Sequence, residues 1–521
     1  MRGVRRRAAP RLRRAYFGNE EGGGAVEMAN CSKSLAELGL AARGGRSARV
    51  TGLSVDSRDV RPGHLFAAMP GSRVHGAGFV EPALEKGAAA VLTDAEGARQ
   101  AAGALERADV ALVISDTPRA ALAKAAARWF GAQPGTVVAV TGTNGKTSVA
   151  SFLRQIWIAC GERAVNLGTT GVEGAWAHPL AHTTPEPITL HRVLAEAAAA
   201  GVTHVAMEAS SHGLDQCRLD GVRLAAAGFC SFSQDHLDYH PTLEEYFRAK
   251  AGLFARVLPV EGIAVVNLDA VRGPEMAGIA RARGQRVIGV GRSEEADLRI
   301  LAQRCDTTGQ ELRLRWQGRA VQLRLSLVGD FQAWNTTLAA GLALACGAEA
   351  ERVFAALPRL ATVRGRMQLA ATRANGAAVY VDYAHTPDAV ATALRAMRPH
   401  VMGRLVAIVG AGGDRDTSKR APMGRAAADH ADLVIVTDDN PRSEDPAAIR
   451  AAVLAGAPGA MEVGDRAEAI LRGAALLEPG DALLICGKGH ETGQTVGDTT
   501  YPFDDVEQAS LAVAALDGRM P

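Results

Sequence analysis

Cysteine is scarce in this chain of 521 residues, and no CxxC pair occurs. The cysteines are Cys31, Cys160, Cys217, Cys230, Cys305, Cys346 and Cys486. Their scatter argues against a zinc site and against a disulfide framework, and it fits a reducing compartment. We therefore expect a cytoplasmic protein.

Net charge and long apolar runs are also lacking. The formal net charge is only +2, which gives no reason to expect a nucleic acid or a membrane surface as partner. No apolar run approaches the length of a membrane span. The hydrophobic content of 47% is ordinary for a globular protein, and the length predicts two to four domains. We expect a monomer that binds neither nucleic acid nor membrane.

The first residues differ from the rest of the chain. Seven arginines occur in the first fourteen residues, and a glycine-rich stretch follows. A segment rich in arginine and poor in acidic residues is typical of a targeting sequence. The serine content and the apolar stripe of such a sequence are missing here. We expect residues 1–31 to be a disordered tail, or a mis-assigned start with the true start at Met28.

Alternating strand-like and helix-like segments predict an α/β fold throughout. Short apolar runs such as "HLFAAM" and "AAAVLT" predict a small α/β domain over 32–132. "GAQPG" at 131–135 predicts a linker, and 133–360 reads as a parallel sheet with crossover helices. A third α/β unit is expected over 361–521, and no internal repeat is evident.

Polar, glycine-bearing sequences follow the apolar strand-like runs. In the middle of the chain "TVVAV" precedes "TGTNGKT", "VTHVAM" precedes "EASSHG" and "AAAGFC" precedes "SFSQDHLDYH". In the last third the same holds for "DYAHTPD", "GAGGDRD", "TDDNPRSEDP" and "GKGHE". Ligands of open parallel sheets bind outside the carboxyl ends of the strands. We therefore predict two sheets whose functional edges face a shared cleft.

The stretch "TVVAVTGTNGKTS" predicts a strand, a glycine loop and a helix. Helical spacing continues through Val149, Phe152, Leu153, Ile156 and Cys160, and Gly161 is placed to end the helix. Such a loop binds anions, so Lys146 would contact β/γ-phosphates and Thr147 would contact Mg²⁺. Val140 stands where the usual pattern has its first glycine, so a chance glycine turn stays open.

Other side chains could serve that phosphate site, although each has a simpler explanation. Glu208 and His236 follow strand-like runs and are metal-ligand types, but a capping Glu or a surface His is more common. Lys250 lies on a helical pattern and would ordinarily be solvated. A dinucleotide fingerprint at "GAGGDRD" is disfavoured because the third glycine and the directly following helix are missing.

Nine motifs in order resemble those of the Mur ligase family. They are "TGTNGKTS", "EASSHGLDQCRL", "DHLDYH", "YFRAK", "GRMQ", "VDYAHTPD", "GGDRDTSKR", "DNPRSEDP" and "GKGHE". The resemblance covers the chain from about residue 32 onward and is strongest to members that add diaminopimelate. It implies a small UDP-binding α/β domain, a central P-loop ATPase-like parallel-sheet domain and a C-terminal Rossmann-like domain.

The resemblance also implies a reaction. ATP phosphorylates the D-glutamate γ-carboxylate of UDP-N-acetylmuramoyl-L-alanyl-D-glutamate, and an amine of meso-2,6-diaminopimelate displaces phosphate from the acyl phosphate. Mg²⁺ is the implied cofactor, and the product serves peptidoglycan synthesis, hence cell-wall biogenesis, cell shape and cell division. The protein's part in phosphoryl transfer is mainly positioning and charge neutralisation.

Site residues follow from the same resemblance. The ATP-binding set is Gly142, Thr143, Asn144, Gly145, Lys146, Thr147, Ser148, Asn335, Arg366 and Asp382. The metal ligands are Thr147, Glu208, His236 and Lys250, the last as a carbamate (N6-carboxylysine). The catalytic set is Lys146, Lys250, Glu208 and His236, and His385 shares the loop of Asp382. A carbamate turns a cation into an anion, so it supports a Mg²⁺ site instead of repelling the ion.

Two further sets bind the other substrates. The UDP-sugar set is Ser57, Thr183, Thr184, Ser210, Gln216 and Arg218, whose hydroxyls, amide and guanidinium suit diphosphate and carboxylate groups. The diaminopimelate set is Arg415, Asp439, Asn440, Pro441, Arg442, Gly487 and Glu491.

Arg442 is the residue on which the choice of amino acid depends. Diaminopimelate differs from lysine by one extra carboxylate, which Arg442 can grip with two charge-assisted hydrogen bonds. With lysine bound, a buried guanidinium would lack a partner, at a cost of roughly 3–5 kcal/mol. Glu491 suits the substrate's ammonium group.

Several positions depart from the family pattern, and alternatives remain. Arg364 and Gln368 replace Pro and Glu around "GRM", Gln332 replaces an Asn, "GAGGDRD" replaces "GCGGDRD", and "VHGAGF" replaces the first domain's "DGHDF". These departures affect the uracil side and the nucleotide surroundings. The alternatives are a lysine-adding ligase, a folylpolyglutamate synthase, a P-loop switch or motor, and a non-catalytic binding protein.

Overall fold

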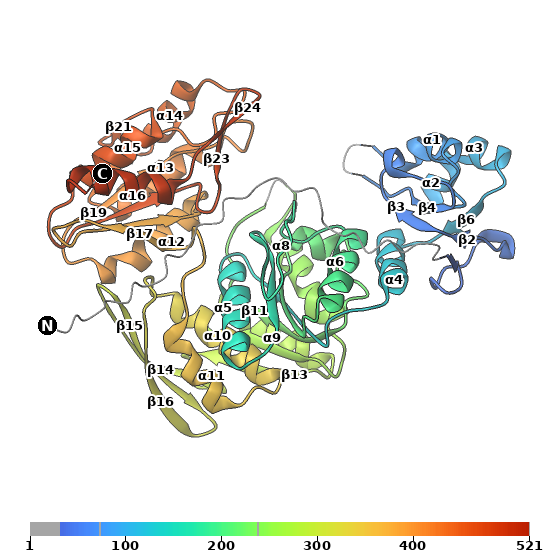
Figure 1. Cartoon of the computed structure of the whole chain (residues 1–521), viewed down its shortest axis with the longest axis horizontal. Coiled ribbons are helices and arrows are strands. Elements are labelled where there is room, and N and C mark those ends of the chain that lie inside the picture. The colour runs from blue at the N-terminus through green and yellow to red at the C-terminus, as the bar shows by residue number, and fades with distance from the viewer. Residues whose placement is uncertain (1–31, 72–73, 237–238, 520–521) are drawn as a thin grey trace, which may run out of the picture.

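Three α/β bodies follow one another along the chain in the computed structural model (Figure 1). The structure describes residues 32–71, 74–236 and 239–519. The expectation for residues 1–31 therefore lies outside the described part of the chain. Among the described residues, no helix is both long and apolar enough to cross a bilayer.

The first body contains a parallel four-stranded sheet in the order β3-β4-β5-β6. Its strands are β3 (Gly52–Ser54), β4 (His64–Ala67), β5 (Ala90–Thr93) and β6 (Ala111–Ile114), with a small pair β1 (Lys33–Ser34) and β2 (Arg49–Val50) beside them. Its helices are α1 (Val80–Glu85), α2 (Ala95–Gln100), α3 (Ala102–Arg107) and α4 (Pro118–Phe130). Leu122 and Trp129 of α4 complete its core.

The central body is built on a ten-stranded sheet in the order β16-β15-β14-β13-β12-β11-β7-β10-β8-β9. The strands are β7 (Thr136–Thr141), β8 (Ala164–Gly168), β9 (Gly171–Gly174), β10 (His204–Glu208), β11 (Leu224–Phe229), β12 (Ile263–Asn267), β13 (Arg286–Gly291), β14 (Leu298–Asp306), β15 (Gly309–Trp316) and β16 (Arg319–Leu325). The helices are α5 (Lys146–Ala159), α6 (Pro187–Ala199), α7 (Ser211–Asp215), α8 (Leu243–Gly252), α9 (Gly273–Ala282), α10 (Gln332–Ala345) and α11 (Ala350–Ala356).

Helices cover both faces of the parallel part of this sheet. One apolar cluster joins the sheet to α5, α10 and α11, and another joins it to α6, α8 and α9. Residues 137–140 of β7 are consequently fully buried on alternating faces. This two-sided burial explains why the parallel strands read as continuous apolar runs.

The antiparallel ribbon β14–β15–β16 was not expected from the sequence, which predicted only a parallel sheet here. Strands β14 and β15, and β15 and β16, pair antiparallel. Their connections hold two residues each, and Gln317 and Gly318 both have positive φ. Such short turns permit only antiparallel pairing, because a parallel return needs a crossover of a dozen residues or more.

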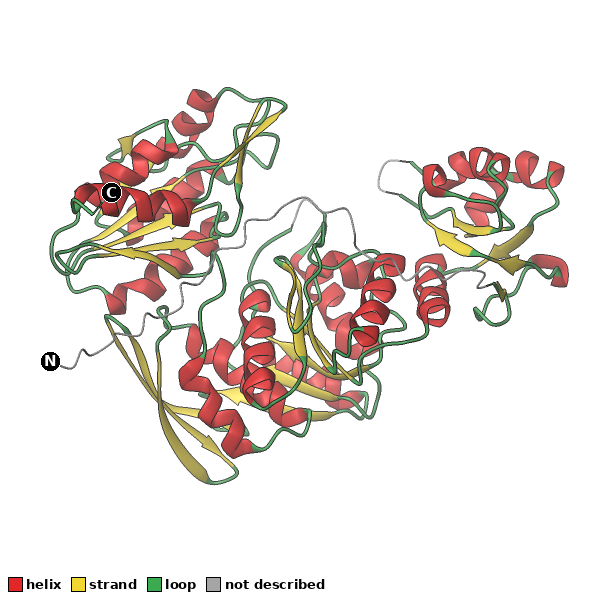
Figure 2. Cartoon of the chain, in the orientation of Figure 1, coloured by secondary structure: helices red, strands yellow, loops and turns green. Residues whose placement is uncertain are grey.

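The third body has a six-stranded sheet in the order β17-β18-β22-β19-β20-β21, parallel except for β17 (Figure 2). The strands are β17 (Gln368–Thr372), β18 (Ala378–Asp382), β19 (Leu405–Val409), β20 (Leu433–Val436), β21 (Met461–Glu462) and β22 (Ala482–Cys486), with a separate hairpin of β23 (Gly493–Val496) and β24 (Thr499–Pro502). Its helices are α12 (Pro387–Met397), α13 (Arg420–His430), α14 (Pro446–Leu454), α15 (Arg466–Ala475) and α16 (Asp505–Leu516).

The bodies contact one another at defined places. Helix α4 packs against α6 of the central body. The His400 ring lies at the end of α12, where Nδ1 is 2.6 Å from the Asp306 carbonyl oxygen and Nε2 accepts from Gly329 N–H at 3.0 Å. Val328 packs into the core of the third body. These contacts join the first body to the central body and the central body to the third.

Candidate functional site

The glycine loop after β7 folds as the sequence predicts. Helix α5 begins at Lys146, and Gly142 and Gly145 before it have φ of 152° and 91°. A Cβ on Gly142 would lie 2.3 Å from Cys230 Sγ and 2.9 Å from Ser231 backbone atoms, so only glycine fits. Backbone N–H groups at such a helix start are suited to binding an anion. Val140 lies buried within the strand.

Two lysines share one acceptor in this loop. Lys146 Nζ donates to the carbonyl oxygens of Gly142 at 2.9 Å and Thr143 at 2.7 Å, and Lys250 Nζ donates to Gly142 at 2.8 Å. Lys250 is 1% exposed and its Nζ lies 4.2 Å from the Tyr246 ring centroid. Burial, together with the nearby charge of Lys146, lowers the pKa of Lys250 well below its usual range. Lys250 is therefore not the solvated lysine that its helical position alone suggests.

Glu208 ends β10 with its carboxylate fixed against α5. Oε2 accepts from the Thr147 hydroxyl at 2.9 Å, and Oε1 accepts from Thr169 N–H at 2.8 Å. Glu208 is 2% exposed. His236 lies in the loop after β11 with φ of 53°, and its Nε2 is 3.5 Å from Asp235 Oδ2. Hydroxyl and carboxylate oxygens that share a buried wall suit a hard cation such as Mg²⁺.

One cavity of about 800 Å³ lies between the central and third bodies and is lined by both. It brings together most of the sequence-predicted residues for ATP and metal. The predicted residues that line it are Thr143, Asn144, Gly145, Lys146, Thr147, Ser148, Thr183, Thr184, Glu208, Ser210, Arg218, His236, Lys250, Asn335, Arg366, Asp382 and His385. The expectation of two sheet edges facing a shared cleft agrees with this cavity.

The third body contributes an anchored cation to this cavity. The Arg366 guanidinium lies 4.5 Å from the Tyr383 ring centroid. Asp382 accepts from Met367 N–H at 2.8 Å and from Ala384 N–H at 2.9 Å, which ties the loop of Arg366 to the end of β18. Burial raises the pKa of the Asp382 carboxyl.

Other lining residues were not singled out from the sequence. They include Thr169, Asn267, Asp269, Phe331, Trp334 and Tyr383. Trp334 Nε1 donates to Asp269 Oδ2 at 2.7 Å. Asn267 ends β12, so the strand-end rule that found Glu208 could have found Asn267 and Asp269.

Gln332, a departure from the family pattern, contacts a predicted site residue. Asn335 Nδ2 donates to Gln332 Oε1 at 3.0 Å. A Cβ on Gly145 would lie 2.6 Å from Asn335 Oδ1, so the amide oxygen is held against the glycine loop. The substitution thus keeps Asn335 oriented.

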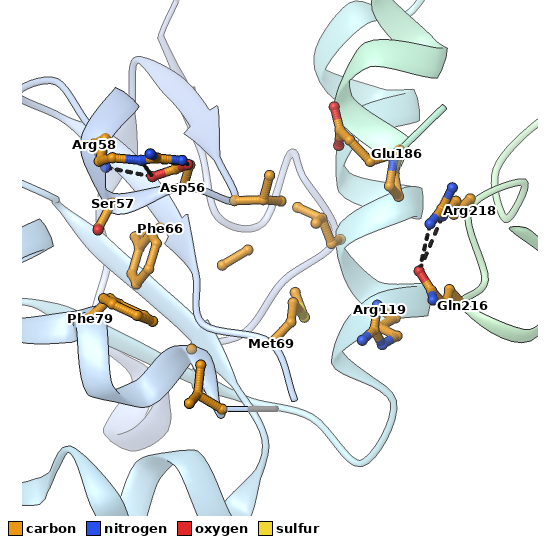
Figure 3. A pocket seen from close by; sticks show the side chains of 16 residues that line it. Asp56, Ser57, Arg58, Phe66, Met69, Phe79, Arg119, Glu186, Gln216 and Arg218 are labelled. Carbon is orange, nitrogen blue, oxygen red and sulfur yellow. Dashed lines mark hydrogen bonds and ion pairs between the residues drawn. The ribbon is translucent and has the colours of Figure 1, made fainter. Parts of the chain in front are cut away.

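A second hollow of about 690 Å³ lies between the first body and the central body (Figure 3). Ser57 and Arg58 line one side, and Gln216 and Arg218 line the other. Phe66, Met69 and Phe79 supply an apolar wall. Arg218 donates to Gln216 Oε1 at 2.8 Å and to the Thr184 carbonyl oxygen at 2.6 Å.

The residues predicted for the UDP-sugar divide between the two hollows. Ser57, Gln216 and Arg218 line the second hollow, whereas Thr183, Thr184 and Ser210 line the cavity that holds Lys146. Arg218 lines both and so connects them.

The predicted amino-acid residues form a separate cluster at the carboxyl ends of β19, β20 and β22. They do not line either hollow described above. Asn440 Nδ2 donates to Glu491 Oε2 at 3.0 Å. Arg442 is half-buried, has φ of 52° and donates to the Gly413 carbonyl oxygen at 2.7 Å. A Cβ on Gly412 would lie 2.8 Å from the Arg442 guanidinium and 3.9 Å from Arg415 Cγ, so both arginines flank this glycine turn.

The remaining members of this cluster lie close to it. A Cβ on Gly487 would lie 2.6 Å from Asp439 Oδ2, and the Pro441 carbonyl oxygen faces Gly413. Lys488, which has no role assigned from the sequence, is fully buried and lies close to Asp439 and Glu491.

Three family models match this chain in order. They are the Mur ligase family catalytic domain over residues 49–130, the Mur ligase middle domain over 140–343, and the Mur ligase glutamate ligase domain over 365–489. The chain belongs to the Mur ligase family.

Relatives and a solved structure support the same membership. The UDP-N-acetylmuramoyl-L-alanyl-D-glutamate–2,6-diaminopimelate ligase of Bradyrhizobium diazoefficiens is 49% identical over 470 residues, which are 89% of this chain and 95% of the relative. The same ligase of Caulobacter vibrioides is 48% identical over 90% of this chain and 96% of the relative. A solved structure of such a ligase has a TM-score of 0.69 at 33% identity and covers 93% of this chain and 99% of its own. The predicted family, α/β fold class and ligase class are confirmed.

Proposed function

We propose that this chain uses ATP to join meso-diaminopimelate to the D-glutamate γ-carboxylate of UDP-N-acetylmuramoyl-L-alanyl-D-glutamate. The observation that chiefly supports the proposal is the cavity that Lys146 and Thr147 line from the central body and Arg366 and Asp382 line from the third. The names of the relatives matched over about nine-tenths of the chain agree with this reaction.

Lys146 and the start of α5 are our candidates for the ATP phosphates. Nζ of Lys146 rests on two loop carbonyl oxygens, and a phosphate oxygen would replace them as a stronger, charged partner. Arg366 lines the same cavity from the third body and would neutralise the transferred group. Asn335 would lie on the nucleoside side.

Thr147 and Glu208 fit a Mg²⁺ ion. Their oxygens are 2.9 Å apart, buried, and within the same cavity. Magnesium usually takes one or two protein oxygens and completes its shell with waters and substrate phosphates. Accordingly, no group of three or more His, Cys, Asp or Glu side chains suited to a metal occurs among the described residues. When bound, the ion would polarise the phosphoryl oxygens.

Lys250 is our candidate for the carbamate. A neutral amine adds to carbon dioxide, forming an N–C bond and releasing one proton. Burial and the neighbouring Lys146 favour the neutral amine of Lys250, as its lowered pKa indicates. The product is an anion beside the glycine loop, where it would support the cation together with Glu208 and His236.

The two substrates would enter from different sides. The UDP group would occupy the hollow at Ser57. Arg218, which lines both hollows, would connect it to the D-glutamate γ-carboxylate near Lys146.

A γ-carboxylate oxygen attacks the terminal phosphorus of ATP, and the bond to ADP breaks. The amine then attacks the acyl carbon, phosphate leaves with the C–O bond pair, and the amine loses a proton. Arg442, Arg415 and Glu491 would hold diaminopimelate during this step.

The test is phosphate release from ATP with the UDP-linked dipeptide and a panel of amino acids. We expect turnover with meso-diaminopimelate and far less with lysine. Turnover with lysine alone would favour the lysine-adding alternative. Turnover that requires glutamate and a folate as acceptor would favour folylpolyglutamate synthase. Absence of ATP turnover with every amino acid would favour a binding protein.

We also propose that the protein acts as a monomer and that its domains span residues 32–132, 133–360 and 361–521.

A further inference from the structure

Lys488 is a fully buried amine to which the proposed mechanism assigns no role. It follows β22 in the loop "GKGHE" and is 0% exposed. Its Nζ donates to Asn440 Oδ1 at 2.9 Å and to the Gly493 carbonyl oxygen at 2.7 Å. The same nitrogen lies 3.5 Å from Asp439 Oδ1 and 3.8 Å from Glu491 Oε2. Burying a charge costs free energy unless the charge is paired and hydrogen-bonded. The four oxygen partners of Lys488 offset this cost.

The first consequence concerns the amide of Asn440. Its Oδ1 accepts from Lys488 and from Thr495 N–H at 3.0 Å, and both of these groups can only donate. The amide nitrogen must therefore point the other way, where it donates to Glu491 Oε2 at 3.0 Å. Lys488 and the Thr495 N–H together fix which end of the amide faces Glu491.

The second consequence concerns charge. Asp439 Oδ1 lies 3.5 Å and Glu491 Oε2 lies 3.8 Å from Lys488 Nζ, and burial followed by the charge of Asp439 raises the pKa of Glu491. The Lys488 cation acts against that rise. A charged Lys488 favours the ionised form of Glu491, and two carboxylates with one ammonium group carry one net negative charge. That charge suits the ammonium group of an amino acid.

The loop that carries Lys488 is itself fixed. Arg466 donates to the Cys486 carbonyl oxygen at 2.9 Å and forms a buried ion pair with Asp505. The hairpin β23–β24 supplies Gly493 and Thr495. Lys488 is therefore held in place from both sides.

We infer that Lys488 is a positioning residue that orients the Asn440 amide and keeps Glu491 anionic, so that the pair receives an ammonium group of the incoming amino acid. This inference rests on the proposed function, because it needs the Asn440–Glu491 cluster to be the amino-acid site.

The test compares Lys488→Met with the wild-type enzyme and with Lys124→Met, an exposed lysine of α4 that serves as matched control. We expect the KM for diaminopimelate to rise about tenfold or more in Lys488→Met, while the KM for ATP stays within about twofold. The acid limb of kcat/KM for diaminopimelate should move to higher pH, because Glu491 loses its cation. The other charged or titratable groups around Lys488 and Glu491 include Asp439, Arg442, Arg466, Asp505 and Tyr383, and they are unchanged in this variant.

Equal rises in both KM values with an unmoved acid limb would overturn the inference, since they indicate only a structural role.

If Lys488→Met does not fold, Asn440→Asp tests the same point. A carboxylate there still accepts from Lys488 and Thr495 but cannot donate to Glu491. We expect the same selective rise in the KM for diaminopimelate, and a wild-type KM would overturn the inference. A wild-type enzyme inactive with every amino acid would instead overturn the proposed function, and the inference with it.

Discussion

Replacing Arg442 with alanine should selectively impair the use of diaminopimelate. The backbone of this residue is held independently of its side chain, because its N–H donates to Thr495 at 3.0 Å and its carbonyl oxygen accepts from Gly497 at 2.7 Å. The substitution therefore removes the guanidinium without releasing the loop. Arg442 is half-buried rather than fully buried. The roughly 3–5 kcal/mol expected for an unpaired buried charge therefore overstates the effect of losing its partner. The loss of charge-assisted hydrogen bonds, about 1.5–3 kcal/mol, is the better measure.

That free energy corresponds to a roughly 10- to 150-fold fall in kcat/KM for diaminopimelate. The assay is phosphate release at saturating ATP and UDP-linked dipeptide, with diaminopimelate and lysine compared in parallel. Arg425→Ala, an exposed arginine on α13, is the matched control and should behave as the wild type. Because the proposed contact of Arg442 is to the extra carboxylate, kcat/KM for lysine should change little. A diaminopimelate value within about twofold of wild type would refute the assignment of Arg442.

Three further predictions concern buried charges. In mass spectrometry under gentle conditions, the peptide that contains Lys250 should carry the added mass of one carbon dioxide. Lys250→Met should lack both the added mass and the turnover. An unmodified peptide from active enzyme would contradict this prediction. Asp505→Ala leaves Arg466 buried without its partner and should destabilise the third body by about 3–5 kcal/mol in denaturant unfolding, whereas a loss below about 1 kcal/mol would contradict the ion pair's role. Burial lowers the pKa of His191 to about 4, so stability should fall as pH drops from about 6.5 towards 4, by about 2 kcal/mol at pH 5. His191→Met should remove that pH dependence, and an equal acid sensitivity in the variant would count against it.

Local patterns in the sequence were sufficient for the glycine loop. The positive φ of Gly142 and Gly145 and the start of α5 at Lys146 depend on glycine and on apolar spacing within a few residues. The strand-end placement of Glu208 and Asp382 was equally accessible, because parallel strands bury both faces and read as apolar runs.

Other features depend on contacts between distant segments. The burial of Lys250 depends on the carbonyl oxygen of Gly142, more than a hundred residues away. The role of Lys488 depends on Gly493 in a hairpin whose polar sequence gives little strand signal. The ribbon β14–β16 was not predicted, because its pairing depends on two turns of two residues each within a stretch that otherwise resembles a parallel sheet with crossover helices. In each case the sequence shows the residue, but only the fold shows its partner.

The shared acceptor of Lys146 and Lys250 links two parts of the proposed chemistry. Both nitrogens donate to the Gly142 carbonyl oxygen, so they lie within roughly 6 Å of each other, where two unit charges repel by about 3 kcal/mol at an effective dielectric of about 20. Lys146 is half-buried, whereas Lys250 is almost completely buried, and burial together with the charge of Lys146 lowers the pKa of Lys250. The neutral amine, which this lowering favours, is the form that reacts with carbon dioxide. The proposed carbamylation of Lys250 would reverse the sign of the interaction, so Lys146 would first favour formation of the carbamate and would afterwards be attracted to it.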